Sequence, residues 1–96
     1  MHDKHAYSAA IAEKLDRWQA KMAQLKSRAD TVPVRHQIEF ERQLDLLYAK
    51  LNYGEEMLLG LRAAGDDPEW YELRVRVDGI CNEIENAIDS AWAKLA

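Results

Sequence analysis

The segment Ala63-Ala64-Gly65-Asp66-Asp67-Pro68-Glu69-Trp70 decides the fold, because it reads as the end of one long helix, a tight reversal and the start of another. Gly65 can close a helix in the left-handed conformation without the steric cost of a Cβ atom. Asp67 can accept hydrogen bonds from the exposed amides of the next helix, and Pro68 fits its first turn, where no amide hydrogen is needed. Because the connection is so short, we expect the two helices to be antiparallel neighbours.

The helices on either side of this reversal carry apolar residues at alternating steps of three and four, which is typical of coiled coils. The helix over residues 33–64 has its main seam at Phe40, Leu44, Leu47, Leu51, Gly54, Leu58 and Leu61. The helix over about 68–95 has Trp70, Leu73, Val77, Ile80, Ile84, Ala87 and Ala91 on core positions. Folding the two together places residue n roughly opposite residue 132 − n.

The middle helix is apolar on more than one face, because Leu46, Tyr53 and Met57 lie away from its main seam. A helix with two apolar faces usually has two partners. Gly54 and Gly60 lie inside this helix, and each costs about 1 kcal/mol relative to alanine. We expect that a bulky neighbour approaches closely at these glycines; a hinge is the alternative reading.

The N-terminal arm, over about residues 6–31, carries a narrow seam that ends near a proline. The seam consists of Ile11, Leu15, Trp18, Met22, Leu25, Ala29 and Val32. Pro33 removes a helical hydrogen bond and biases Val32 away from helical dihedral angles. Either Asp30 or Thr31 caps a new helix and the chain folds back, or one long helix passes through with a kink. The near-continuous apolar stripe slightly favours continuity.

The sequence therefore predicts an all-α single domain over residues 1–96, an antiparallel coiled-coil hairpin whose long first arm is kinked or broken at Pro33. A three-helix bundle is the alternative. In the hairpin, the arm overhangs the covering helix and leaves an apolar seam that either folds back or is covered by a second chain. We therefore expect self-association, with a dimer as the favoured form. The expected interface residues are Ile11, Leu15, Trp18, Met22, Leu25, Leu46, Tyr53 and Trp92.

Composition limits the class of protein. The 96 residues are 48% hydrophobic and 31% charged, which suits a helical domain better than a disordered chain. No apolar run approaches a membrane span and the N-terminus does not resemble a secretory signal, so we expect a cytoplasmic protein. The net charge of −4 gives no reason to expect nucleic acid as a partner. The single cysteine, Cys81, is expected to be a buried structural thiol.

Charge is distributed unevenly along the chain. Residues 1–32 carry six Lys and Arg against four Asp and Glu, whereas residues 65–96 carry three against eight. The last third should therefore be attracted to the first, in the same chain or in a partner. Exposed pairs contribute only about 0 to 1 kcal/mol each, so this attraction sets alignment more than stability.

Several short motifs resemble a known family. Leu15-Asp16-Arg17-Trp18, Asp66-Asp67, Trp70, Leu73-Arg74, Val77 and Ala87 are similar to motifs of small bacterial coiled-coil proteins described as stress-associated. Arg76 stands where that family tends to have glycine, and Cys81 where it tends to have tryptophan. The resemblance implies a long helix with a returning helix and a role under stress. It implies no catalytic residues.

No set of residues predicts catalysis or a cofactor. His36 and Glu39 could present two ligands on one helical face, but a closed metal site needs three or four, so we read them as solvated surface groups. The sequence has no glycine-rich phosphate loop and no nucleophile elbow. We therefore expect a non-enzymatic structural or protein-interaction module without metal or cofactor. The alternative is a peripheral protein that lays an amphipathic helix on a membrane surface, which is not favoured because the cationic excess of residues 14–28 is modest.

Overall fold

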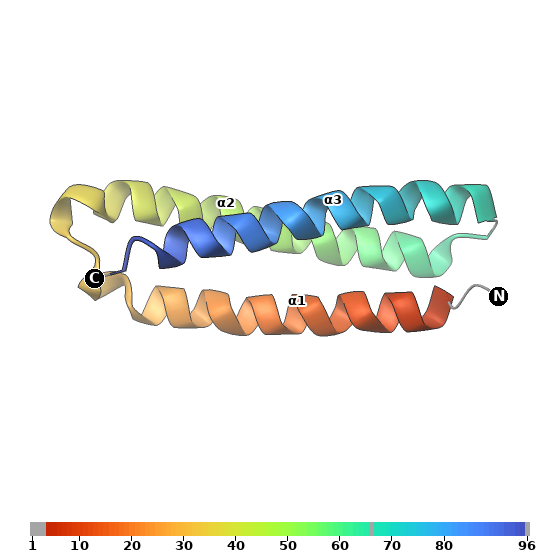
Figure 1. The fold of residues 1–96 in the computed structure, drawn as a ribbon, viewed down its shortest axis with the longest axis horizontal. Coiled ribbons are helices and arrows are strands. Elements are labelled where there is room, and N and C mark those ends of the chain that lie inside the picture. The colour runs from red at the N-terminus through yellow and green to blue at the C-terminus, as the bar shows by residue number, and fades with distance from the viewer. Residues whose placement is uncertain (1–3, 66, 96) are drawn as a thin grey trace.

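The computed structural model describes residues 4–65 and 67–95, and over these residues it has three α-helices that lie side by side in a rod of 51 × 17 × 16 Å (Figure 1). The helices are α1 (Lys4–Ser27), α2 (Val34–Ala63) and α3 (Asp67–Trp92), and a short 3-10 turn spans Ala29–Thr31. No β-strand occurs in the described residues. The predicted all-α class is confirmed.

The chain turns back between α1 and α2, where the sequence slightly favoured a continuous helix. The amide of Arg28 is shared between the carbonyls of Gln24 and Leu25, and the Thr31 hydroxyl donates to the Arg28 carbonyl. Val32 is then extended, with φ −76° and ψ 130°, as expected for a residue that precedes proline. The expectation of a helix that runs to residue 31 was therefore wrong at this end.

Pro33 occupies the position before the first residue of α2, where its missing amide hydrogen breaks no helical bond. No side chain caps α2, so neither Asp30 nor Thr31 has the capping role that one reading gave it. The Pro33 carbonyl accepts from the amide of His36, and the Gln37 side chain donates to the Val32 carbonyl. A backbone amide and the side-chain amide of Gln37 thus hold the start of α2 against the turn.

The connection between α2 and α3 is short, as predicted, but it uses a different conformation. No described glycine has a positive φ, so Gly65 does not close α2 in the left-handed conformation. Instead Ala64 is extended at φ −61° and ψ 125°, and its amide donates to the Leu61 carbonyl. Asp66 lies outside the described residues. The extended backbone of Ala64 therefore ends α2 without a left-handed residue.

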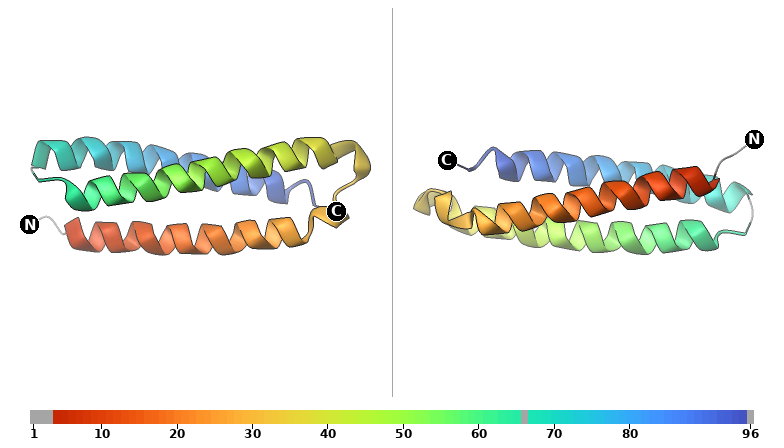
Figure 2. Two further views of the ribbon diagram at one scale, coloured as in Figure 1. Left: turned by 180° about the vertical axis from the view of Figure 1, so that it is seen from behind. Right: turned by 90° about the horizontal axis from the view of Figure 1, so that it is seen from below.

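Contacts between α2 and α3 agree with the expected register. The ammonium of Lys50 lies 3.5 Å from the Glu83 carboxylate, and that of Lys94 lies 3.5 Å from Glu39. Both partners lie one residue further along α3 than the predicted alignment places them. The two helices run antiparallel for most of their length (Figure 2).

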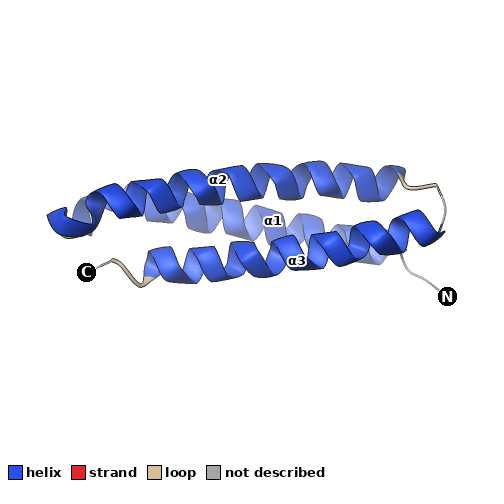
Figure 3. Ribbon diagram, turned by 90° about the horizontal axis from the view of Figure 1, so that it is seen from above, coloured by secondary structure: helices blue, strands red, loops and turns tan. Residues whose placement is uncertain are grey.

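Helix α1 lies alongside both other helices (Figure 3), and its seam packs against them. Its residues join the side chains of α2 and α3 in one hydrophobic cluster. The largest fully buried side chains are Leu25, Phe40, Leu47, Leu61 and Ile84. Because α1 is antiparallel to α2 and parallel to α3, its first residue meets the start of α3: Lys4 pairs with Asp67.

Gly54 is where α1 and α3 approach α2 closely. A Cβ atom built on Gly54 would lie 3.1 Å from Leu15 Cδ2 and 3.6 Å from Ile84 Cδ1. The expected close neighbour is therefore confirmed at this position. A Cβ atom built on Gly60 would have no neighbouring atom within 4 Å, so the expected close approach of a bulky neighbour is wrong at Gly60.

Candidate functional site

The predicted interface residues divide into two groups in the structure. The five residues from α1 are at most 8% exposed, because α2 and α3 of the same chain cover them: Ile11, Leu15, Trp18, Met22 and Leu25. They are part of the core, so they offer no surface to a partner. The other three remain accessible, with Leu46 at 59%, Tyr53 at 44% and Trp92 at 38% exposed. Of the eight predicted residues, only these three are accessible to a partner.

Part of the accessible surface of α2 forms a stripe that we call the α2 outer face. It is built from residues spaced by three or four positions, so they share one side of the helix. The stripe comprises Ile38, Arg42, Leu46, Ala49, Tyr53, Glu56 and Gly60, with Leu59 beside it. Ile38 and Leu59 are 74% and 65% exposed. The buried seam of α2 packs on α1 and α3, and the stripe lies mainly on the other side of the helix. Leu46 is at its edge, beside Asn86, Ala87 and Ser90 of α3.

Sequence reasoning identified two members of the α2 outer face and missed the rest. Leu46 and Tyr53 stood out because they lie off the main seam. Ile38 and Leu59 lie off the seam as well, and the same spacing rule could have found them. Met57, which the sequence placed with Leu46 and Tyr53, is only 8% exposed and belongs to the core.

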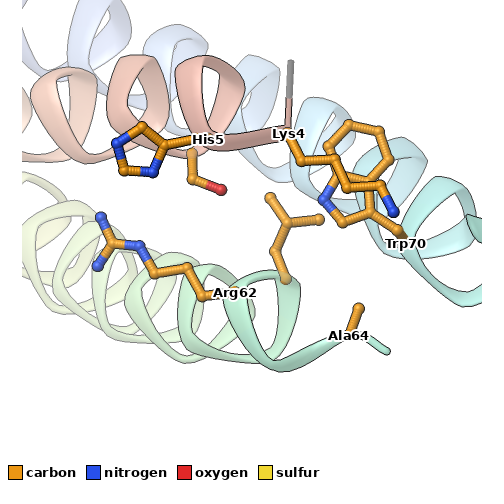
Figure 4. Close-up of a pocket in the computed structure, with 7 residues that line it drawn as sticks. Lys4, His5, Arg62, Ala64 and Trp70 are labelled. Carbon is orange, nitrogen blue, oxygen red and sulfur yellow. The ribbon is translucent and has the colours of Figure 1, made fainter. Parts of the chain in front are cut away.

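A second candidate site is a pocket of about 390 Å³ at the end of the bundle where α2 turns into α3, which we call the Trp70 pocket (Figure 4). All three helices contribute to its wall. It is lined by Lys4, His5, Ser8, Leu61, Arg62, Ala64 and Trp70. Figure 4 shows His5 and Arg62 on one side of the space and Trp70 on the other.

The Trp70 side chain has its ring faces occupied and its N–H unpaired. Lys4 Nζ and the Arg74 guanidinium each lie 5.7 Å from the centre of the indole ring. Tyr7 meets the ring edge-on at 5.5 Å between centroids. Trp70 is 2% exposed, yet its Nε1 has no hydrogen-bond partner among the described residues. Sequence reasoning placed Trp70 in the core correctly, but nothing in the spacing indicated an orphaned donor.

Tyr7 links α1 to α3 beside this pocket. Its hydroxyl donates a hydrogen bond to the Asp78 carboxylate, and the Arg74 guanidinium lies 4.8 Å from the centre of its ring. Burial, followed by the hydrogen bond and the negative charge of Asp78, raises the pKa of Tyr7 far above its ordinary value. The phenol therefore stays protonated and continues to donate over the physiological pH range.

Trp92 is half-exposed at the other end of the bundle, as expected for a residue at its edge. The guanidinium of Arg28 lies 5.2 Å from its ring centre, which places the end of α1 against the end of α3. Among the described residues, no group of three His, Cys, Asp or Glu side chains could hold a metal ion. The described helices also include none that is long and apolar enough to cross a membrane.

Cys81 is a buried free thiol, which confirms the expected burial. Burial raises its pKa; Lys14 opposes this rise, whereas Asp78 and Glu85 add to it. Because the thiolate is the reactive form, a raised pKa and a covered sulfur should both slow alkylation and disulfide exchange.

We expect Cys81 to react with Ellman's reagent at about pH 8 at least about tenfold more slowly than free glutathione. The same chain unfolded in concentrated urea serves as the control and should react at the rate of an ordinary thiol. A folded protein that reacts as fast as glutathione would contradict the buried placement.

Comparison with known proteins gives no assignment, because no family model, no curated protein and no solved structure matches this chain.

Proposed function

We propose that this chain is a non-enzymatic protein-interaction module, built as a three-helix bundle of coiled-coil type, that self-associates through the α2 outer face. The observation that carries the proposal is the group of exposed apolar side chains on the α2 outer face, with Arg42 and Glu56 among them. Exposed apolar residues that gather on one face are a feature of interaction surfaces. A role under stress, which the family resemblance implies, stays a prediction.

The α2 outer face is complementary to a second copy of itself. Arg42 and Glu56 lie seven residues before and after Ala49, on the same side of the helix. If two copies pack their α2 helices antiparallel with a two-fold axis beside Ala49, each Arg42 meets Glu56 of the second copy. The contact is isologous, so the ion pair forms twice. Within the described residues of one chain, neither side chain has an ion-pair partner of its own.

Small residues on the stripe favour close approach of the two helices. Ala49 would lie on the axis, and Gly60 would face Ile38 of the second copy. Gly60 has open space around its Cα within its own chain, although a glycine inside a helix costs about 1 kcal/mol. Contacts within one chain do not explain why glycine occupies position 60. A side chain of the second copy that packs onto Gly60 would explain it.

The size of the stripe sets the expected affinity. One helix face buries less area than a standard interface of about 1,600 Å², so we expect a weak dimer with a dissociation constant of about 1 µM or higher. Sedimentation equilibrium over a wide concentration range is therefore the suitable measurement.

Reversing one charge should weaken this dimer, and reversing both should restore it. In Arg42→Glu, two carboxylates replace each ion pair, and because the pair occurs twice, we expect the dissociation constant to rise about tenfold at low salt. Glu56→Arg should have a similar effect, and the double variant should return to the affinity of the starting protein.

The matched control is Arg17→Glu, which makes the same change of net charge on α1, where Arg17 is exposed beside Glu13. Its dimerisation should be unchanged. A protein that stays monomeric at all concentrations, or a double variant no tighter than either single variant, would refute the proposed pairing.

Co-sedimentation with anionic phospholipid vesicles separates this proposal from membrane-surface binding. The apolar stripe of α1 is enclosed in the core, so binding through that stripe requires the bundle to open. Saturable, salt-sensitive binding with retained helicity, in a protein that does not dimerise, would replace the interaction module by the membrane alternative.

A further inference from the structure

The Trp70 pocket contains a buried hydrogen-bond donor that finds no partner among residues 4–65 and 67–95. Most buried polar groups in folded proteins have a partner, and an unpaired one is a reason to look for a missing ligand. Trp70 Nε1 is such a group, on a side chain that is 98% covered. In Figure 4 the indole nitrogen is on the side of the ring that faces the space between α1 and α2.

The other polar side chains of the pocket are also donors or cations. Arg62 and His5 lie opposite Trp70, and Ser8 contributes a hydroxyl. None of the described residues that line the space carries a carboxylate. Arg62 forms no ion pair with another described residue, so its guanidinium is available to an anion. Arginine presents parallel N–H groups that match the two oxygens of a carboxylate.

Two acidic side chains at this end of the bundle are engaged by other residues. Asp67 pairs with Lys4, and Asp78 accepts the hydrogen bond of Tyr7. Two helices, α1 and α3, begin at this end of the bundle and one, α2, ends there. The positive ends of two helix dipoles therefore outnumber the negative end of the third, which favours a negative charge between them.

The remaining wall is apolar and limits the ligand to a small molecule. Leu61 and Ala64 form one side, and the edge of the Trp70 ring forms another. A volume of about 390 Å³ is at the lower end of small-molecule pockets. Apolar walls with a few convergent donors suit an anion that carries a short apolar group better than a bare inorganic ion.

We propose that the Trp70 pocket binds a small organic monoanion, a carboxylate with a short apolar chain. Arg62 pairs with the carboxylate, the Trp70 N–H donates to one of its oxygens, and the apolar chain rests on Leu61. One chain supplies all the lining residues, so this site does not depend on the proposed dimer.

Propionate is the probe, and the indole ¹H–¹⁵N signals of the full-length chain are the readout, with the Trp70 signal assigned by Trp70→Phe. We expect the Trp70 signal to shift saturably as propionate is added, while the signals of Trp18 and Trp92 stay still. Arg62→Gln should weaken binding about tenfold, because a charge-assisted hydrogen bond is lost. Arg62 is exposed, so this variant should remain folded, which circular dichroism checks.

The controls are one variant and two further probes. Arg35→Gln removes an exposed arginine at the opposite end of the bundle and should leave propionate binding unchanged. Propionamide, which lacks the charge, should not shift the signal saturably. A linear shift, an equal response to propionamide, or equal affinity in Arg62→Gln would overturn the proposal. Tighter saturation by inorganic phosphate than by propionate would also overturn it, since phosphate has no apolar group.

Discussion

Replacing Ile84 by alanine is expected to lower the free energy of unfolding by about 2 to 5 kcal/mol. Ile84 is 0% exposed and is one of the largest fully buried side chains of the core. Its Cδ1 packs against Gly54 of α2, where no Cβ is present to fill the space that a shorter side chain would leave. Truncation therefore removes buried apolar area and opens a cavity that rigid helices can close only in part.

Urea unfolding followed by circular dichroism measures this effect, at a protein concentration low enough to keep the chain monomeric. Val75→Ala is the matched control, because Val75 lies on the same helix and is 72% exposed. Its effect should stay within about 0.5 kcal/mol, as for most surface substitutions. If Ile84→Ala leaves the midpoint unchanged, the packing of α3 on α2 is not as described. Should the alanine variant fail to fold, Ile84→Val gives a graded test with an expected cost of about 0.5 to 1.5 kcal/mol.

Gly54→Leu is expected to destabilise the bundle by about 1 to 3 kcal/mol, even though leucine favours helix more than glycine does. The new side chain would enter the space where Leu15 and Ile84 meet α2. Its Cβ alone would lie 3.1 Å from Leu15 Cδ2, closer than an ordinary van der Waals contact, and Ile84 Cδ1 and Ile80 Cγ2 lie within 4 Å of the same atom. Either α1 moves outward or the core side chains leave their preferred rotamers.

The same substitution at Gly60 should have the opposite sign. No atom lies within 4 Å of a Cβ at that position, so Gly60→Leu gains helix propensity without a clash and should raise stability by about 0.5 to 1 kcal/mol. Because Gly60 faces the second copy in the proposed dimer, the same variant should also weaken dimerisation. Equal effects of leucine on the free energy of unfolding at both glycines would contradict the observed packing.

The helices and their pairing register follow from the sequence because they depend on local spacing. Steps of three and four identify the seams, and the short connection after Ala63 forces α2 and α3 together. Lys50 and Glu83 lie within one residue of the expected alignment for that reason. Gly54 could be assigned to a close contact because a glycine inside a long helix is costly unless something needs the space.

The path of α1 was harder to predict, because an apolar seam has the same spacing whether the helix continues or folds back. The reversal depends on how residues 28–33 arrange their backbone hydrogen bonds, and those bonds use Thr31, Pro33 and Gln37 in a non-repeating way. Once α1 folds back, its seam is covered by its own chain. The predicted interface therefore moves away from α1.

The candidate sites depend on how the helices are rotated about their own axes. The α2 outer face is accessible because the buried seam of α2 packs on α1 and α3, and spacing alone does not specify this packing. The Trp70 pocket brings His5 of α1 next to Arg62 of α2, residues far apart in the sequence. Its main signal, an indole N–H without a partner among the described residues, exists only once the three helices are in place.

Because the chain runs through three helices, each antiparallel to the one before it, the start of α1 and the end of α3 lie at opposite ends of the bundle. The first residue of α1 and the last residue of α3 lie at opposite ends of a body 51 Å long (Figure 1). Anything fused before α1 is thus held away from anything fused after α3 by roughly the length of the bundle. A fluorophore attached near each terminus should report one fixed transfer efficiency that falls on unfolding, because the unfolded chain, with a radius of gyration of about 31 Å, is about twice the size of the folded rod at 15.4 Å.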